Sequence, residues 1–242
     1  MKNQNLLFIP LIVAIIFFSC SKNNTVKPAP PSKPSLNENY DDGASYASAD
    51  LPAGDTIKSF STTWIVPSTP PLDSTIFWWN ALDGGACQPV LQWESGSWTI
   101  ANWYFNDNLD GQGPTYHHGT FLPVKPGTQL TGVIELVSYT ANSFTYTESF
   151  VGYPAADVTF TRTTLATGLV EDQEAYTNTY LAFPKDPVLK MTAINCITTA
   201  GTNPPALNWT VKNPQTKTPT GHLAFEVINP SSSNGEVDFF LQ

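Results

Sequence analysis

The sequence is poor in positive charge, and this shortage excludes one large class of function. It has 11 Lys and Arg residues against 20 Asp and Glu residues, a formal net charge of -9, and Arg162 is its single arginine. A surface that binds nucleic acid neutralises phosphates with a stripe of Lys and Arg side chains. We therefore expect no nucleic acid among the partners of this protein.

Charged residues of both signs are scarce, at 13% of the chain, whereas aromatic residues make up 12%. The scarce types include Lys, Glu and Arg, which favour helices, while Thr, Val, Trp and Tyr, which favour strands, are common. The composition therefore predicts an all-β protein with enough aromatic side chains for a sizeable core.

Long hydrophobic runs are absent except at the N-terminus, where residues 6–18 are apolar apart from Pro10. This run is too short for a membrane span and has the length of a signal-peptide core. It ends in FFSC, which resembles a bacterial lipobox and implies cleavage before Cys20 and lipidation of the Cys20 thiol. An ordinary secretory signal followed by a chance cysteine is the alternative. Both interpretations predict export, and the first predicts a lipid anchor in the bacterial cell envelope.

We accordingly divide the chain into three parts. Residues 1–19 are the predicted lipoprotein signal peptide. Residues 20–39 are rich in Pro, Ser, Asn and Lys and contain almost nothing apolar, so we expect a disordered tether that cannot bury a core. Residues 40–242 are predicted to form one folded domain, a monomer.

About a dozen strand-like segments follow one another in this domain without a convincing amphipathic helix. Residues 90–94 and 97–105 flank the turn Ser95-Gly96, which is typical of a hairpin, and residues 144–149 alternate between aromatic or acidic and small polar side chains. A further strand is predicted over residues 174–182. The pattern indicates a two-sheet antiparallel β-sandwich.

Residues 78–92, WWNALDGGACQPVLQ, carry the most informative motif, Trp-x3-Asp-Gly-x2-Cys-x4-Gln. This stretch resembles the glutamic peptidase (eqolisin) family, in which a Trp is followed by an Asp-Gly turn, a Cys and a strand ending in Leu-Gln. Residues 63–67 (TWIVP) and 98–104 (WTIANWY) are similar to two further segments of that family. The resemblance implies a concanavalin-A-like jelly roll that hydrolyses polypeptides at acidic pH without a cofactor or metal.

The resemblance also implies roles for single residues. Gln92 matches the catalytic Gln of the family. Glu174, in QEAY, is the closest counterpart of the catalytic Glu, which the family carries in a strand of the form Ala-Glu-Trp-Ile, and Glu171 and Asp172 are nearby competitors. In such a pair the carboxyl group, desolvated among aromatic rings, takes a proton from water and returns it to the leaving amine, while the Gln amide stabilises the oxyanion.

The walls of the cleft are assigned in the same way. The resemblance places Trp79 and Asp83 at the border of the active site, and we expect the aromatic side chains of the WTIANWY segment to bind extended peptide. The predicted substrate-binding residues are Trp79, Asp83, Trp98, Trp103 and Tyr104.

The sequence departs from the family at two points. Asn102 stands where the family has an acidic residue beside its Trp-Tyr pair. Cys87 is present, but its usual disulfide partner is absent. Cys196 is the remaining candidate partner, and two free thiols are the alternative.

Glycan or peptide binding, metal binding and glycoside hydrolysis are alternatives to peptide hydrolysis. Exposed Trp and Tyr rings on a β-sandwich stack on sugars, so a glycan-binding or peptide-binding lipoprotein without catalysis is the alternative. Adjacent His117 and His118 point to opposite faces of a strand and cannot easily chelate one metal. The order Glu171-Asp172-x-Glu174 does not match the carboxylates at alternate positions used by β-sandwich glycoside hydrolases.

Overall fold

The computed structural model describes residues 43–107, 114–177, 180–212 and 224–241. The chain divides into two units, Met1–Pro30 and Pro31–Gln242, and all the described residues belong to the second. The predicted signal peptide, Cys20 and the tether over residues 20–39 lie outside the described residues. Within the part that is described, no helix has the length and hydropathy needed to cross a membrane.

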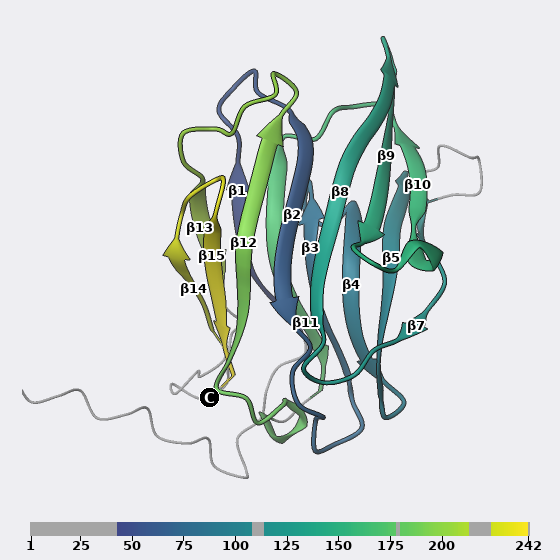
Figure 1. Ribbon diagram of the computed structural model, residues 1–242, viewed down its shortest axis with the longest axis vertical. Helices are drawn as coiled ribbons and strands as arrows, with labels where there is room; N and C mark the ends of the chain where they lie inside the picture. The colour runs from purple at the N-terminus through teal and green to yellow at the C-terminus, as the bar shows by residue number, and fades with distance from the viewer. Residues whose placement is uncertain (1–42, 108–113, 178–179, 213–223, 242) are drawn as a thin grey trace, which may run out of the picture. The chain divides into compact units, whose positions relative to one another are not determined.

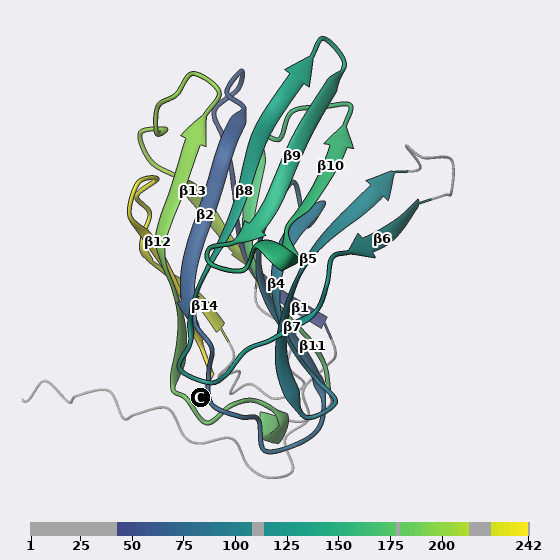
Figure 2. The same cartoon turned by 45° about the vertical axis from the view of Figure 1, so that its right-hand side comes forward.

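Two antiparallel sheets face each other in the second unit (Figures 1 and 2). The first sheet has the strand order β13-β1-β11-β3-β4-β5-β6, and β7 also pairs with β5. Its strands are β1 (Gly43–Asp50), β3 (Thr75–Leu82), β4 (Cys87–Glu94), β5 (Ser97–Asp107), β6 (Pro114–His118), β7 (Leu122–Pro123), β11 (Gly168–Tyr176) and β13 (Asn208–Lys212).

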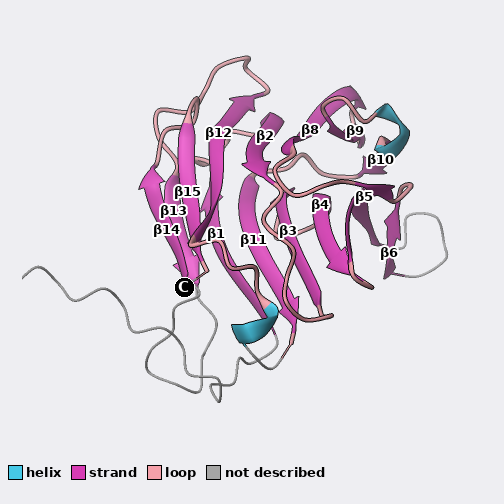
Figure 3. Ribbon diagram, turned by 60° about the horizontal axis from the view of Figure 1, so that its bottom comes forward, coloured by secondary structure: helices cyan, strands magenta, loops and turns pink. Residues whose placement is uncertain are grey.

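The second sheet has the order β10-β9-β8-β2-β12-β15-β14. Its strands are β2 (Ile57–Ile65), β8 (Gln129–Thr140), β9 (Ser143–Phe150), β10 (Val158–Arg162), β12 (Val188–Thr198), β14 (Ala224–Asn229) and β15 (Gly235–Phe240). The helical turns in the described part are the short η1 (Pro154–Ala156) and η2 (Tyr180–Ala182), drawn in cyan in Figure 3. The predicted two-sheet antiparallel β-sandwich is confirmed.

The predicted strands differ from the observed ones in two respects. β1, β6 and β7 were not predicted. β1 consists mostly of Ala, Ser and Gly, which have little intrinsic strand preference, and it is held in place by pairing with β11 and β13 on its two sides. The predicted strand over residues 174–182 is wrong, because β11 already ends at Tyr176 and residues 180–182 form η2.

Aromatic side chains from both sheets meet in the core. Trp78 of β3 is fully buried, and its ring centroid lies 5.6 Å from that of Trp98 on β5 and 6.5 Å from that of Phe239 on β15 of the opposite sheet. Phe60 of β2 and Tyr146 of β9 are also fully buried. Burial of such large side chains supplies much of the free energy that holds the two sheets together.

Two glutamates lie in this core. Glu148 of β9 accepts a hydrogen bond from the backbone N–H of Gln88 (3.2 Å), and Glu171 of β11 accepts one from the Thr62 hydroxyl. Burial raises the pKa of both carboxyl groups well above the ordinary value. The second Glu171 oxygen and Oδ1 of Asn80, its cross-strand neighbour on β3, have no hydrogen-bond partner among the described residues. A protonated Glu171 can donate to such an acceptor, whereas a carboxylate cannot.

The buried glutamates predict that the fold is most stable at acidic pH. The pKa of Glu171 is higher in the folded than in the unfolded chain, so its contribution is fully present below about pH 4.5, the ordinary value, and is lost as the pH rises toward the folded value. Urea unfolding at pH 4 and pH 8 measures this loss. We expect Glu171→Gln to reduce it, because Gln has no proton to lose.

Glu135→Gln is the matched control, since Glu135 is an exposed glutamate on β8. An equal loss of stability from pH 4 to pH 8 in the unmodified protein and the Glu171→Gln variant would contradict the prediction.

The two cysteines in the described part, Cys87 and Cys196, are buried free thiols, so they form no disulfide. Burial, together with Glu148 of the facing strand β9, raises the pKa of Cys87, and burial raises the pKa of Cys196 to about 12. Cys196 lies on β12, which is separated from β9 by β8 and β2. Because Cys87 faces β9, about three strand spacings, or roughly 14 Å, separate the two cysteines. This separation is well beyond the reach of a disulfide.

Candidate functional site

The outer face of the first sheet, which points away from the second sheet, carries its own small apolar cluster. Its buried members come from β3, β4 and β11, and partly buried rings pack around them. The cluster consists of Trp79, Ala81, Val90 and Val170, packed by Tyr46, Phe77 and Trp103. An apolar cluster on this face requires cover from a ligand, a loop or the curvature of the sheet, and it marks a candidate binding surface.

A hollow of about 450 Å³ lies over this cluster, and we call it the aromatic groove. It is lined by Phe77, Trp79, Gly84, Gln88, Val90, Trp103, Tyr116, Asp172, Glu174 and Tyr176. Tyr116 on β6 and Glu174 on β11 both line it although β3, β4 and β5 lie between them, so the sheet curves around the groove. Burial and the charge of Glu174 raise the pKa of the Tyr116 hydroxyl.

Strand alternation separates the three acidic residues of β11. Glu171 points into the core, whereas Asp172 and Glu174 point into the aromatic groove. Asp172 is only 4% exposed, and Oδ1 of its carboxyl group has no hydrogen-bond partner among the described residues. Burial and the charge of Glu174 raise the pKa of Asp172 well above the ordinary value. Glu174 is half-buried and accepts a hydrogen bond from the Tyr176 hydroxyl.

Of the two competing acids, the structure therefore places Asp172 beside Glu174 in the candidate site and removes Glu171 from it. The sequence contained a signal for the pair, because Asp172 and Glu174 are two positions apart on one strand. The expectation that the order Glu171-Asp172-x-Glu174 offers no carboxylates at alternate positions is therefore wrong for Asp172 and Glu174. Two carboxyl groups in different environments on one face are an arrangement suited to acid–base catalysis.

Gln92 lies on the outer face of β4, in the same cross-strand row as Glu174, with Phe77 of β3 between them. The backbones of β11 and β4 are therefore about 10 Å apart. The Gln92 amide donates to a Glu94 oxygen at 2.5 Å, and its own Oε1 is buried without a partner among the described residues. Gln92 and Glu174, the two predicted catalytic residues, thus lie on one face of the sheet but not in contact. The glutamine that lines the groove is Gln88.

The predicted aromatic walls divide between the two faces of the sheet. Trp79 and Trp103 line the groove. Trp98 and Tyr104 point the other way, a correction that follows from alternation along β5. Trp98 is 2% exposed within the core, and Tyr104 packs against the core with its ring centroid 5.3 Å from that of Phe160 on β10.

The two histidines of β6 also lie on opposite faces. The His117 ring stacks on Tyr104 with centroids 5.1 Å apart, and the His118 ring lies 4.8 Å from that of Trp103 on the groove side. Nowhere in the described ranges do three or more His, Cys, Asp or Glu side chains gather as metal ligands would. Asn102 points into the core, where its amide donates to the Ala156 carbonyl at 2.7 Å.

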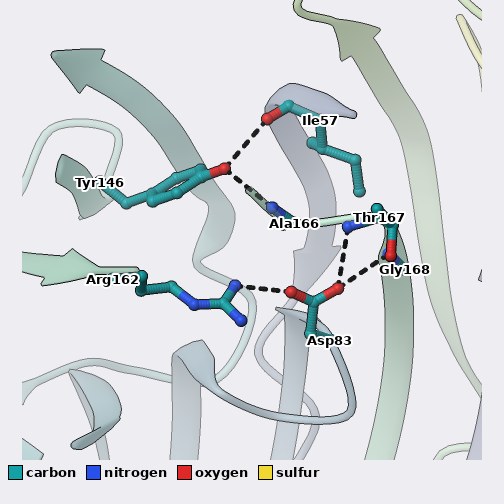
Figure 4. Close-up of polar contacts among 7 residues, drawn as sticks. All are labelled: Ile57, Asp83, Tyr146, Arg162, Ala166, Thr167 and Gly168. Atoms are coloured by element: carbon teal, nitrogen blue, oxygen red, sulfur yellow. Dashed lines mark hydrogen bonds and ion pairs between the residues drawn. The ribbon is translucent and has the colours of Figure 1, made fainter. Parts of the chain in front are cut away.

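Asp83, in the turn between β3 and β4, holds the edge of the groove through three polar contacts (Figure 4). Its Oδ2 forms a 2.6 Å ion pair with Arg162 at the end of β10, and its Oδ1 accepts 2.9 Å hydrogen bonds from the backbone N–H groups of Thr167 and Gly168. Asp83 itself has φ 46°, which begins the left-handed turn between β3 and β4. The carboxylate therefore joins this turn to the start of β11 and to the opposite sheet.

These contacts predict that Asp83 acts mainly through stability. Asp83→Asn keeps an oxygen for the two backbone donors but loses the ion pair, and we expect a loss of about 1.5 kcal/mol. Arg162→Gln should lose a similar amount. A double-mutant cycle by urea unfolding measures the coupling, and additive effects of the two changes would contradict a direct interaction.

Comparison with known proteins gives a likeness at the level of structure. No family model matches the chain, and no curated protein sequence matches it. Eight chains of known structure match. One is the crystal structure of scytalido-glutamic peptidase with a transition state analog inhibitor, at 15% identity over 85% of this chain and 99% of that chain, with a TM-score of 0.44. At this identity the likeness concerns the course of the chain and not the side chains of the groove.

Proposed function

We propose that this protein is a peptide hydrolase that works at acidic pH, with Asp172 and Glu174 as its carboxyl pair. The observation that carries the proposal is the presence of both carboxyl groups on one face of β11 in a single aromatic-lined groove. The Trp-x3-Asp-Gly-x2-Cys-x4-Gln motif over residues 78–92, with its resemblance to the glutamic peptidases, supports a polypeptide as the substrate.

The two carboxyl groups divide the chemistry between them. Glu174, the more accessible one, takes a proton from a water molecule whose oxygen attacks the peptide carbonyl carbon. Asp172, whose pKa is raised by burial and by the charge of Glu174, holds its proton and gives it to the amine as the C–N bond breaks. The products gain the elements of one water molecule, and the pair is reset when the proton on Glu174 returns to Asp172.

The oxyanion of the tetrahedral intermediate needs a hydrogen-bond donor, and β4 offers two glutamines on its outer face. Gln88 lines the groove, where its Nε2 donates to the Gly85 carbonyl at 2.7 Å and retains a second N–H. Gln92, the residue implied by the resemblance, has to leave Glu94 and pass Phe77 to reach Glu174. Both glutamines are therefore tested.

Digestion of an unfolded protein substrate between pH 2 and pH 6 tests the proposal. We expect the purified protein to cleave it, and Glu174→Gln and Asp172→Asn each to lower the rate about 10²-fold or more. Glu135→Gln, on the outer face of the second sheet, should leave the rate unchanged. Loss of the oxyanion donor should also cost about 10²-fold, so Gln88→Ala and Gln92→Ala identify which glutamine supplies it.

Undiminished cleavage by both carboxyl variants would reject the assignment of the pair. No cleavage by the unmodified protein at any acidic pH would favour a second candidate, a glycan-binding module. The rings of Trp79, Trp103, Tyr116 and Tyr176 in the groove favour this candidate, since such rings stack on sugars. In that case oligosaccharide binding should be lost in Trp79→Ala and retained in Asp172→Asn.

We also propose that the domain is exported and anchored through a lipid on Cys20. The support is the FFSC sequence after the apolar run of residues 6–18. Cys20→Ser should abolish incorporation of a labelled fatty acid and move the protein from the membrane fraction. Labelling that persists in this variant would contradict the anchor.

A further inference from the structure

A second hollow of about 360 Å³ adjoins the aromatic groove, and we call it the acidic hollow. It lies over β1 and β11 and is lined by Tyr46, Ser48, Asp50, Asp83, Gly84, Gly168, Leu169, Val170 and Asp172. Gly84 and Asp172 line both hollows, so a chain lying in one can extend a side chain into the other.

The charges around the acidic hollow are unbalanced. Asp83 is compensated by Arg162 and by two backbone N–H groups. Asp50 is exposed at the end of β1, and Asp172 is 4% exposed with an Oδ1 that has no partner among the described residues. No Lys, Arg or His stands among the described residues that line either hollow. A buried carboxyl oxygen that has no partner among the described residues is an acceptor that a ligand in the hollow can use.

Tyr46 presents its ring to a cation at the border of the acidic hollow. It lies directly across from Asp172 on β1 and from Lys212 on the edge strand β13. The Lys212 ammonium nitrogen lies 5.5 Å from the centroid of the Tyr46 ring, within the range of a cation–π interaction. The Tyr46 ring therefore lies within reach of a positive charge that belongs to the protein itself.

We infer that the acidic hollow is a specificity subsite for a Lys or Arg side chain of the polypeptide that occupies the aromatic groove. The inference rests on the proposed function, since it names the substrate class of that site. The aliphatic stem of the substrate side chain lies along Tyr46 and Val170. Its cationic head lies against the Asp50 carboxylate and donates a hydrogen bond to the unpartnered Oδ1 of the protonated Asp172. Charge-assisted hydrogen bonds to these carboxyl groups select a cation over a neutral side chain.

Binding of pentalysine to the full chain tests the subsite without requiring catalysis. Calorimetry at pH 6 compares pentalysine with its fully ε-acetylated form, which has the same stem and no charge. We expect pentalysine to bind more tightly, and Asp50→Asn to weaken its binding about tenfold. Lys212→Gln should strengthen it, because a competing cation has been removed from Tyr46. Glu135→Gln removes an exposed carboxylate elsewhere and should change nothing.

A second measurement separates this inference from the proposed function. Two peptides that differ by Lys or norleucine at one position are offered as substrates, and kcat/KM is compared. Cleavage without preference for the lysine peptide overturns the subsite and leaves the hydrolase standing. Pentalysine binding that weakens in Asp50→Asn and strengthens in Lys212→Gln, without any peptide cleavage, supports the cation site and rejects the hydrolase. Equal binding of pentalysine and its acetylated form also overturns the subsite.

Discussion

The groove depends on the register between β11 and β3, and Asp83 holds that register. The backbone N–H of Asp83 donates to the Gly168 carbonyl at 2.9 Å, while its carboxylate accepts from Thr167 and Gly168. Leu82 is thereby set opposite Leu169, and the rest of β11 follows in step. A shift of one residue would exchange the two faces of β11 and bury Asp172 and Glu174 in the core. The ion pair with Arg162 ties this fixed point to the second sheet.

Three buried acids in different parts of the fold share a raised pKa. Glu148 and Glu171 lie between the sheets, and Asp172 lies at the floor of the groove, and burial raises the pKa of all three well above the ordinary values. Desolvation penalises the carboxylate and favours the protonated acid. An acidic pH therefore protonates the buried glutamates of the core and also keeps the proton on Asp172. Stability and the proposed chemistry both favour low pH for the same reason.

The sequence predicts the class of fold well because most strands carry aromatic or β-branched residues with turn residues between them. β1 escapes prediction because GASYASAD has no such signal and depends on its neighbours for pairing. β11 is a different case. Its residues 171–174 are polar on both faces, so alternation cannot say which acids face the core, and only the partners across the strands decide this.

The aromatic residues of β5 follow the same rule. Trp98, Trp103 and Tyr104 are all large and apolar, and alternation separates Trp103 from the other two without saying which face is the core. The residues opposite them do so, since Trp103 pairs with Gln88 on the outer face and Trp98 pairs with Trp93 in the core. A site formed by a sheet with two apolar faces therefore becomes visible only once the register is known.

The composition shows that cations are scarce, and the structure shows which acidic and aromatic groups two of them contact. Arg162, the single arginine, is held by Asp83, and Lys212 lies over Tyr46 at the border of the acidic hollow. The groove and the acidic hollow thus present carboxyl groups, and the part of the chain that the structure describes adds no Lys, Arg or His to their linings. Since the Asp50 carboxylate attracts a cation and the protonated Asp172 can accept a hydrogen bond from it, positive charge on a substrate is the complement that this surface lacks.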